Sequence, residues 1–126
     1  MTLVFDAGAL VAVERDDRDV VALIKRERRA GRAPVTHGGV IGQVWRGGTG
    51  RQANLARLLP GLEIVGLDDE LGRRVGVLLG RTKTTDVIDG AVALLATDGD
   101  EILTSDIHDM RRLVRATGAH VEVIKV

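Results

Sequence analysis

The sequence predicts an α/β protein in which a parallel β-sheet carries helices on both faces. Short runs rich in Val, Leu and Ile alternate, along 126 residues, with longer segments whose apolar residues recur every three or four positions. Because helical segments separate the β-prone runs, successive strands are expected to run parallel and to be joined by helical crossovers. The length predicts a single domain over residues 1–126, large enough to bury a core.

The first half of the chain predicts two strands and three helices. Residues 2–5 form an apolar strand, and residues 18–32 form an amphipathic helix that ends near a glycine. Residues 33–37 predict a second short strand. A helix is expected over residues 40–45, broken by the glycine pair that follows, and another over residues 52–59, ended by a Pro-Gly pair.

The second half continues the alternation with three strands and three helices. Strands are expected over residues 62–67, 101–106 and 121–126, and helices over residues 68–79, 86–96 and 109–118. Gly80 directly follows the first of these helices and Gly118 ends the last, as helix-ending glycines do. The pattern contains no linker, repeat or low-complexity segment.

The composition limits the classes of function. There is no cysteine, which rules out disulfides and thiolate metal sites and fits a reducing compartment. No apolar run approaches the ~18 residues that a membrane span needs, and no signal-peptide pattern is visible. We therefore expect a cytoplasmic protein without membrane contact. Aromatic residues make up 2% of the chain, so base-stacking platforms are not expected.

The net charge is zero, but the charges are unevenly distributed. Between Lys25 and Arg57 there are eight Lys and Arg residues and one acid, Glu27. Between Asp86 and Asp109 there are seven acids and no Lys or Arg. This asymmetry indicates a surface for a polyanion beside a centre that binds cations, although two ordinary solvated faces would show the same pattern.

Several carboxylates are expected at one edge of the sheet. Asp6 and Asp106 each end a predicted strand, and ligands of open parallel sheets bind at the carboxyl ends of the strands. Asp86 and Asp89 begin a helix that starts at the same edge, and their spacing of three places them on one helix face. Clustered carboxylates repel one another unless a cation joins them, and such oxygen ligands suit Mg²⁺ or Mn²⁺.

Helix capping is the competing interpretation of the same acids. Asp86 and Asp106 are suitable N-caps, with Asp89 and Asp109 completing acidic first turns that favour the helix dipole. For Asp6 and Asp106 this interpretation is weaker, because their place at a strand end is more obvious than a cap role. The three histidines are scattered without ligand spacing, and the glycine pairs form no phosphate-binding fingerprint.

Four stretches, in order and spacing, carry a resemblance to a known family. They are LVFDAGALVAVE, GVIGQVWRGG, DVIDGAVALLA and ILTSDIHDM, and together they extend over nearly the whole chain. This chain resembles PIN domains of the VapC-like toxin ribonucleases in bacterial type II toxin–antitoxin systems. The resemblance implies a PIN-like three-layer sandwich, Mg²⁺- or Mn²⁺-dependent cleavage of RNA, a homodimer, and a cognate VapB-like antitoxin that plugs the acidic site.

Carried over position by position, the resemblance assigns the metal site. Asp6, Asp89 and Asp106 match the family's metal-binding aspartates, and they would act in catalysis through a metal-bound water. Gln43 stands where the family usually has a catalytic Glu. An amide carries no charge and cannot act as a general base, so metal affinity and activity are expected to fall. Natural weakening, natural loss of catalysis and engineered inactivation all remain open as explanations of this glutamine.

Further residues are assigned less directly. Asp86 and Asp109 lie close enough in sequence to serve as auxiliary metal ligands. Arg46, just after Gln43, is a candidate RNA contact, as are other basic residues of the 25–57 segment. Such contacts would be driven by charge and would be sensitive to salt.

Three other functions compete with the ribonuclease. A catalytically silent PIN-like domain that binds RNA or an antitoxin would explain Gln43. A haloacid-dehalogenase-like phosphatase requires Asp-x-Asp after the first strand, and Gly8 occupies the second of these positions. A receiver-like phosphoacceptor domain requires paired acids near the start and a Lys in a late strand loop, a role for which Lys125 is poorly placed.

Overall fold

The structure is a computed structural model that describes all 126 residues. Five strands and seven α-helices follow one another along the chain, and two short 3₁₀ turns, Gly50–Gln52 and Leu59–Gly61, flank the fourth helix. In chain order the elements are β1 (Leu3–Phe5), α1 (Ala7–Glu14), α2 (Arg18–Arg29), β2 (Val35–His37), α3 (Gly38–Val44), α4 (Ala53–Leu58), β3 (Glu63–Val65), α5 (Asp69–Thr82), α6 (Val87–Leu95), β4 (Glu101–Thr104), α7 (Ile107–Thr117) and β5 (Glu122–Lys125).

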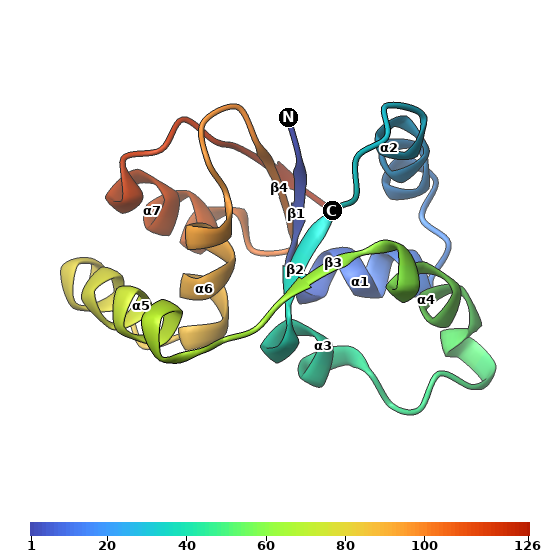
Figure 1. Cartoon of the computed structure of the whole chain (residues 1–126), viewed down its shortest axis with the longest axis horizontal. Helices are drawn as coiled ribbons and strands as arrows, with labels where there is room; N and C mark the ends of the chain where they lie inside the picture. Colours follow the sequence, from blue (N-terminus) through green and yellow to red (C-terminus); the bar gives the residue numbers. More distant parts are fainter.

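The five strands form one parallel sheet in the order β3-β2-β1-β4-β5. The central strand β1 pairs Val4 with Val35 of β2 on one side and with Ile102 of β4 on the other. Helices α5, α6 and α7 pack together on one face, and α1 to α4 cover the other, so that the sheet stands between two helical layers (Figure 1). The predicted fold class, α/β with a parallel sheet flanked by helices, is confirmed.

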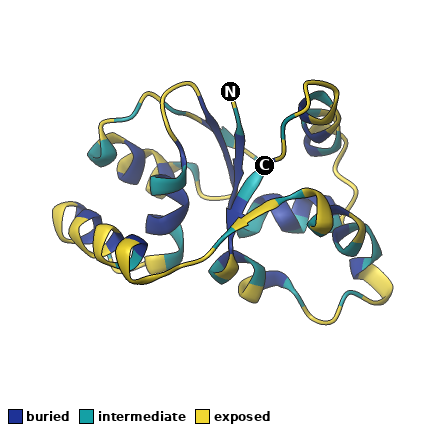
Figure 2. Ribbon diagram, in the orientation of Figure 1, coloured by how far each residue is buried: buried dark blue, intermediate teal, exposed yellow.

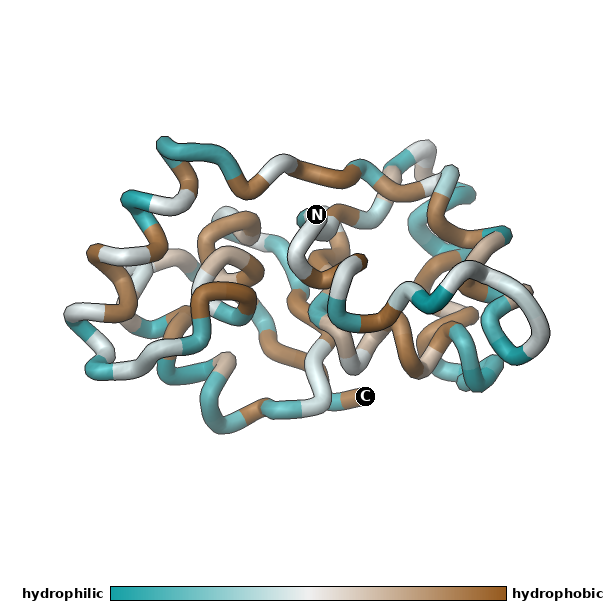
Figure 3. The backbone as a smooth tube through the Cα atoms, turned by 90° about the horizontal axis from the view of Figure 1, so that it is seen from below, coloured by the Kyte–Doolittle hydropathy of each residue, from teal (hydrophilic) through white to brown (hydrophobic).

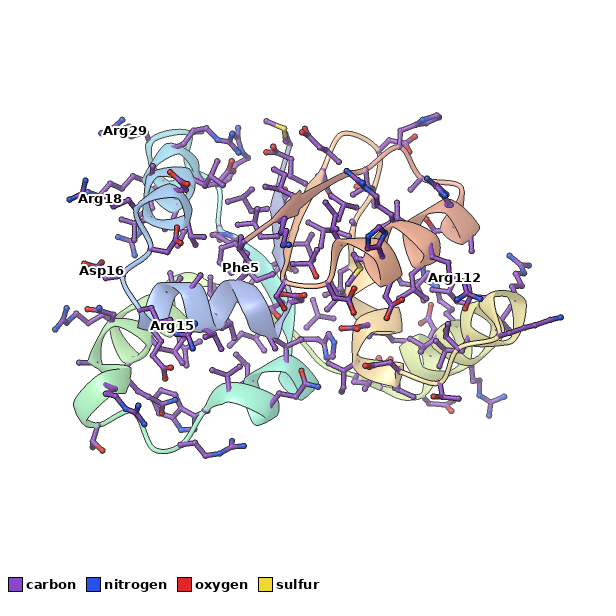
Figure 4. All side chains as sticks on the ribbon, turned by 180° about the vertical axis from the view of Figure 1, so that it is seen from behind. Phe5, Arg15, Asp16, Arg18, Arg29 and Arg112 are labelled. Carbon is purple, nitrogen blue, oxygen red and sulfur yellow. The ribbon has the colours of Figure 1, made fainter.

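A core of 27 buried apolar residues fills the space on both sides of the sheet. Every residue of β1 and of β4 is buried, and these strands lie at the centre of the molecule (Figure 2). Phe5, the only phenylalanine, is fully buried between the two layers (Figure 4). Strands covered on both faces are expected to read as continuous apolar runs, as LVF does. No helix combines the length and the apolar character that crossing a membrane requires.

The first helix is the element that the sequence pattern did not predict. The residues of α1, AGALVAVE, are apolar almost all round, so they show no helical periodicity. Tertiary packing explains this composition, because α1 lies between the sheet and helices α2, α3 and α4. The predicted strands and the other helices are present with small shifts at their ends. The largest shifts are in α2, which ends at Arg29 rather than at residue 32, and in α5, which continues past Gly80 to Thr82 and is capped by Lys83 in the left-handed conformation.

A buried ion-pair network fastens α2 to the sheet. The side chain of Glu27 is 0% exposed and accepts hydrogen bonds from Arg32 Nε at 2.6 Å and from Arg26 Nη2 at 3.0 Å. Arg26 also reaches Glu101, the first residue of β4, at 2.6 Å. The hydrogen bond from the Arg32 guanidinium is the main reason that the pKa of Glu27 lies below its ordinary value. The charge of this buried carboxylate is thus satisfied by two cations.

Replacement of Glu27 by glutamine is expected to destabilise the fold. Loss of the charge-assisted hydrogen bonds lowers the free energy of unfolding at neutral pH by about 1–3 kcal/mol. Because the folded-state pKa of Glu27 is lowered, this stabilisation is present above its ordinary value of 4.5 and is lost as the pH falls through the folded-state value. Urea denaturation at neutral and acidic pH measures both effects.

The exposed ion pair between Asp69 and Arg73 provides the control. Both side chains are more than 80% exposed, so Asp69→Asn is expected to change stability by only ~0.5 kcal/mol or less. Equal losses in Glu27→Gln and Asp69→Asn would contradict the role given to the buried network.

Candidate acidic site at the carboxyl edge of the sheet

Strand ends and helix starts bring the predicted acids to one edge of the sheet. Asp6 follows β1 directly, Asp106 follows β4 after one residue, and Asp89 lies in the first turn of α6. Figure 3 views the chain from the side of this edge. Since all strands are parallel, their carboxyl ends lie on the same side, as the sequence predicted.

Asp6 is held in place by several hydrogen-bond donors. Its carboxylate caps α1 by accepting from Ala9 N at 3.1 Å, and its other oxygen accepts from the hydroxyl of Thr104. The backbone N–H groups of Gly8 and Ser105 also lower the pKa of Asp6. The side chain is nonetheless buried, and this burial raises the pKa of Asp6 above its ordinary value. Asp6 is therefore a fixed but electrostatically unfavourable carboxylate.

Thr104 is a site residue that the sequence analysis missed. Its hydroxyl donates to Asp6 Oδ2 and accepts from the backbone N–H of Asp106 at 3.0 Å. It thus joins the acids that follow the two central strands. A Thr two positions before an Asp does not by itself indicate a contact with a distant carboxylate. The contact depends on the pairing of β1 with β4, which sets Phe5 opposite Leu103.

Asp89 lies at the electrostatic centre of the acids. Burial is the main reason that its pKa is raised from 3.8 to about 6, and the charges of Asp86, Asp6, Asp106 and Asp109 raise it further. No Lys or Arg forms an ion pair with any of these five residues, because the ion pairs of the structure involve only Arg26, Arg32 and Arg73. The structure therefore brings all five predicted acids into one cluster of uncompensated negative charge.

Three of these acids also cap helices. Asp86 accepts from Asp89 N at 3.0 Å at the start of α6, and Asp106 accepts from Asp109 N at 3.3 Å at the start of α7. Asp6 caps α1, which corrects the expectation that Asp6 and Asp106 have weak cap roles. In Asp86 and Asp106 only Oδ1 is used, so Oδ2 accepts no hydrogen bond from the protein. Capping and cation binding can therefore use different oxygens of one carboxylate.

The chemistry of this cluster fits a hard divalent cation. Carboxylate oxygens are the ligands that Mg²⁺ and Mn²⁺ prefer, and a cation would compensate the repulsion that raises the pKa of Asp89. As the side chains stand, no three His, Asp or Glu groups are close enough together to hold a metal ion. Direct ligation by three of them therefore requires the carboxylates to approach one another. Asp86 and Asp106 are exposed, which leaves their side chains room to rotate.

Gln43 lies exposed near the end of α3, and its side chain makes no hydrogen bond. The start of its helix is fastened to α6 by His37, a buried residue to which the sequence assigned no role. His37 Nδ1 accepts from Gly39 N at 3.1 Å, and Nε2 lies 2.9 Å from the carbonyl oxygen of Ile88. The helix that carries Gln43 is thus anchored beside the residue that precedes Asp89.

Arg46, the predicted RNA contact, has a structural role at the end of α3. Its guanidinium Nη1 donates to the carbonyl oxygens of Trp45 at 2.7 Å and Gly42 at 3.2 Å, and so satisfies carbonyl groups at the end of α3. The side chain is exposed and forms no ion pair, so its remaining N–H groups are open to a ligand.

The raised pKa of Asp89 predicts a pH dependence of stability. The folded chain holds this proton more tightly than the unfolded chain, so the free energy of unfolding falls as the pH rises from 3.8 to about 6. Allowing for the solvent screening of this half-buried group, the loss is on the order of 1 kcal/mol. Asp89→Asn is expected to remove this loss and to raise the melting temperature at neutral pH.

Urea denaturation between acidic and neutral pH measures this effect, with Glu63→Gln as the control. Glu63 is exposed on the edge strand β3, and its side chain makes no hydrogen bond or ion pair. An unchanged pH slope in Asp89→Asn would show that the repulsion among these carboxylates does not affect stability.

Comparison with known proteins supports the fold. No protein-family model matches the sequence, and no curated protein matches it. The structure is similar to a chain in the crystal structure of VapBC2 from Rickettsia felis bound to a DNA fragment from their promoter, with a TM-score of 0.69 and 14% sequence identity. The match covers 98% of this chain and 98% of that chain. At this identity the likeness concerns the fold.

Proposed function

We propose that this protein is a PIN-domain ribonuclease of the VapC-like type, the toxin of a toxin–antitoxin pair. The observation that carries the proposal is the cluster around Asp89, where burial and four neighbouring carboxylates raise the pKa to about 6 and no basic side chain forms an ion pair. The cluster occupies the carboxyl edge of a fold shared with a VapBC2 structure. The repulsion among these carboxylates is unfavourable for folding, and such unfavourable clusters are typical of functional sites. A divalent cation would relieve the repulsion and could then bind an anionic substrate.

In this proposal Asp6, Asp89 and Asp106 would hold Mg²⁺ or Mn²⁺, with Asp86 and Asp109 in support. When bound, the ion would supply positive charge at the scissile phosphate and lower the pKa of a water. The chain orients the site beforehand, because Thr104 and the backbone of α1 fix the carboxylate of Asp6. Gln43 can hydrogen-bond a water but cannot take its proton, so this chain would be a weakened enzyme.

Basic residues supply the affinity for RNA that an acidic site lacks. The segment from Lys25 to Arg57 carries eight Lys and Arg residues. Of these, Arg26 and Arg32 are engaged with Glu27, and the others form no ion pair with an acid. Free cationic side chains bind phosphates and release counterions, so the affinity for RNA would fall steeply with salt.

A cleft between α2 and α4 supports a protein partner. It has a volume of about 220 Å³, and its lining combines apolar and cationic side chains. The apolar ones are Val13, Val21, Ile24 and Leu58, and the cationic ones are Lys25, Arg28 and Arg57. Asn54 and one acid, Asp16, complete the lining, so the cations outnumber the acid. A segment with apolar and acidic side chains, such as part of a VapB-like antitoxin, would match both features.

A homodimer and a cytoplasmic location complete the proposal. Exposed apolar side chains such as Ile64 and Val77 favour the dimer.

The test is a cleavage assay on several end-labelled RNAs with Mg²⁺, Mn²⁺ or EDTA. We expect slow internal cleavage with either metal and none with EDTA, and isothermal titration is expected to show binding of the metal alone. If neither RNA cleavage nor metal binding is detected, and the glutamate variant described below is also inactive, the acids serve as helix caps and the ribonuclease proposal fails.

The alternative is a catalytically silent PIN-like domain that binds RNA or an antitoxin. Gln43 is the observation that favours it, because this residue removes a charge from the position of the family's usual Glu. Metal binding and RNA binding without cleavage under any condition would select this alternative.

A further inference from the structure

The glycine-rich loop between α3 and α4 borders a polar cavity that the acidic site does not include. The loop reads WRGGTGRQ over residues 45–52. The cavity has a volume of about 300 Å³ and is lined by Glu14, Val44, Arg46, Thr49, Arg51 and Gln52. It is large enough for a hydrated anion.

Gln52 holds the loop in one conformation. Its buried side chain accepts from the backbone N–H of Arg46 at 2.8 Å and of Gly48 at 3.2 Å, and it donates to the carbonyl oxygen of Val44 at 2.8 Å. Gly48 has φ +75°, and a Cβ there would lie 2.2 Å from Trp45 Cη2. The loop therefore requires glycine at this position, and its shape is set before any ligand binds.

The polar groups around the cavity are suited to an anion. Arg51 is exposed and makes neither an ion pair nor a side-chain hydrogen bond. Arg46 keeps its Nε and Nη2 groups free while Nη1 holds the end of α3. Thr49 precedes a 3₁₀ turn, but its hydroxyl caps nothing. Glu14 is the one acid in the lining, so two guanidinium groups leave a net positive charge.

The cavity lies a short distance from the acidic cluster. Asp6 caps the start of α1 and Glu14 is the last residue of this eight-residue helix, which is about 12 Å long at 1.5 Å per residue. Helix α3, which leads into the loop, packs against α1. A nucleic-acid strand with one phosphate at the acidic edge would therefore have another phosphate within reach of the cavity.

We propose that the cavity bordered by Arg46, Thr49 and Arg51 binds a backbone phosphate of the RNA, a short distance along the strand from the scissile position. Guanidinium groups bind phosphate oxygens through paired, charge-assisted hydrogen bonds, and a hydroxyl adds another donor. The site compensates for the acidic cluster, which by itself repels RNA. The inference rests on the proposed function for the identity of the ligand, and on the cavity for the place where it binds.

Binding of a fluorescent single-stranded RNA, measured by anisotropy in EDTA over a range of salt, tests the proposal. Arg51→Gln is expected to weaken binding several-fold at low salt. It should also reduce the slope of log K against log salt by about 0.7, the value for one phosphate contact on a single strand. Arg18→Gln is the matched control, because Arg18 is exposed on α2 and borders neither cavity (Figure 4).

Titration with inorganic phosphate, followed by amide NMR, gives an independent measure and is expected to shift the signals of residues 47–52. Equal effects of Arg51→Gln and Arg18→Gln, or no effect of either, would overturn the RNA subsite. Phosphate shifts without RNA binding would overturn it too, and would leave a site for free phosphate. A selective effect of Arg51→Gln supports the subsite even if the cleavage assay is negative, in which case only the nuclease proposal fails.

Discussion

The Asp6→Asn variant is expected to cleave RNA about 100-fold more slowly than the parent chain, or slower still, and to remain folded. Asp6 is fixed by Thr104 and by the backbone of α1, and in the proposed mechanism it holds the cation. Even residues that only support metal ligands contribute 10–100-fold, so this range is a lower bound. Asparagine caps helices as well as aspartate does, so the start of α1 is preserved.

Single-turnover cleavage rates in Mg²⁺, measured together with urea denaturation, separate chemistry from folding. Burial raises the pKa of Asp6, so a neutral amide at this position avoids the cost of burying a charge, and the variant is expected to be as stable as the parent or more stable. Asp17→Asn makes the same change at the N-cap of α2, where Asp17 accepts from Asp19 N and Val20 N. Equal cleavage by the two variants would exclude Asp6 from the chemistry.

The Gln43→Glu variant is expected to cleave RNA roughly 10–100-fold faster than the parent. A carboxylate at this position could orient a water and accept its proton, and general-base catalysis contributes 10²-fold or more when its geometry is favourable. Gln43 is exposed and makes no hydrogen bond, so the substitution disrupts no contact. Without metal, the added charge should lower stability slightly, because His37 holds the start of α3 against α6, the helix that carries Asp89.

Metal-dependent cleavage rates and the metal dissociation constant are the two measurements for this variant. Ala33→Glu adds the same charge at an exposed position just before β2, at the opposite edge of the sheet, and is expected to change neither. If Gln43→Glu binds the metal and RNA as the parent does but cleaves no faster, the glutamine is not what limits this site.

The sequence predicted much of the site because carboxyl-edge positions follow from chain order. A residue just after a strand, such as Asp6, lies at the same edge as one just after another parallel strand, whatever the details of packing. This regularity is what brought Asp6, Asp89 and Asp106 into one prediction. It could not show that Asp6 is buried, or that burial and neighbouring charges raise the pKa of Asp89, because those properties depend on neighbours far apart in sequence.

By itself, the sequence determined the fold class, the order of most elements and the residues at the acidic edge, since local periodicity and strand ends are readable one segment at a time. Only the tertiary structure decided that AGALVAVE is a helix. Its residues are apolar all round because the sheet and helices α2, α3 and α4 surround it, and such a segment shows no helical periodicity. Tertiary structure also decided that Thr104 joins Asp6 to Asp106, and that Gln52 shapes a loop with two free arginines. These contacts arise from strand pairing and helix packing, which bring together residues that no spacing in the sequence connects.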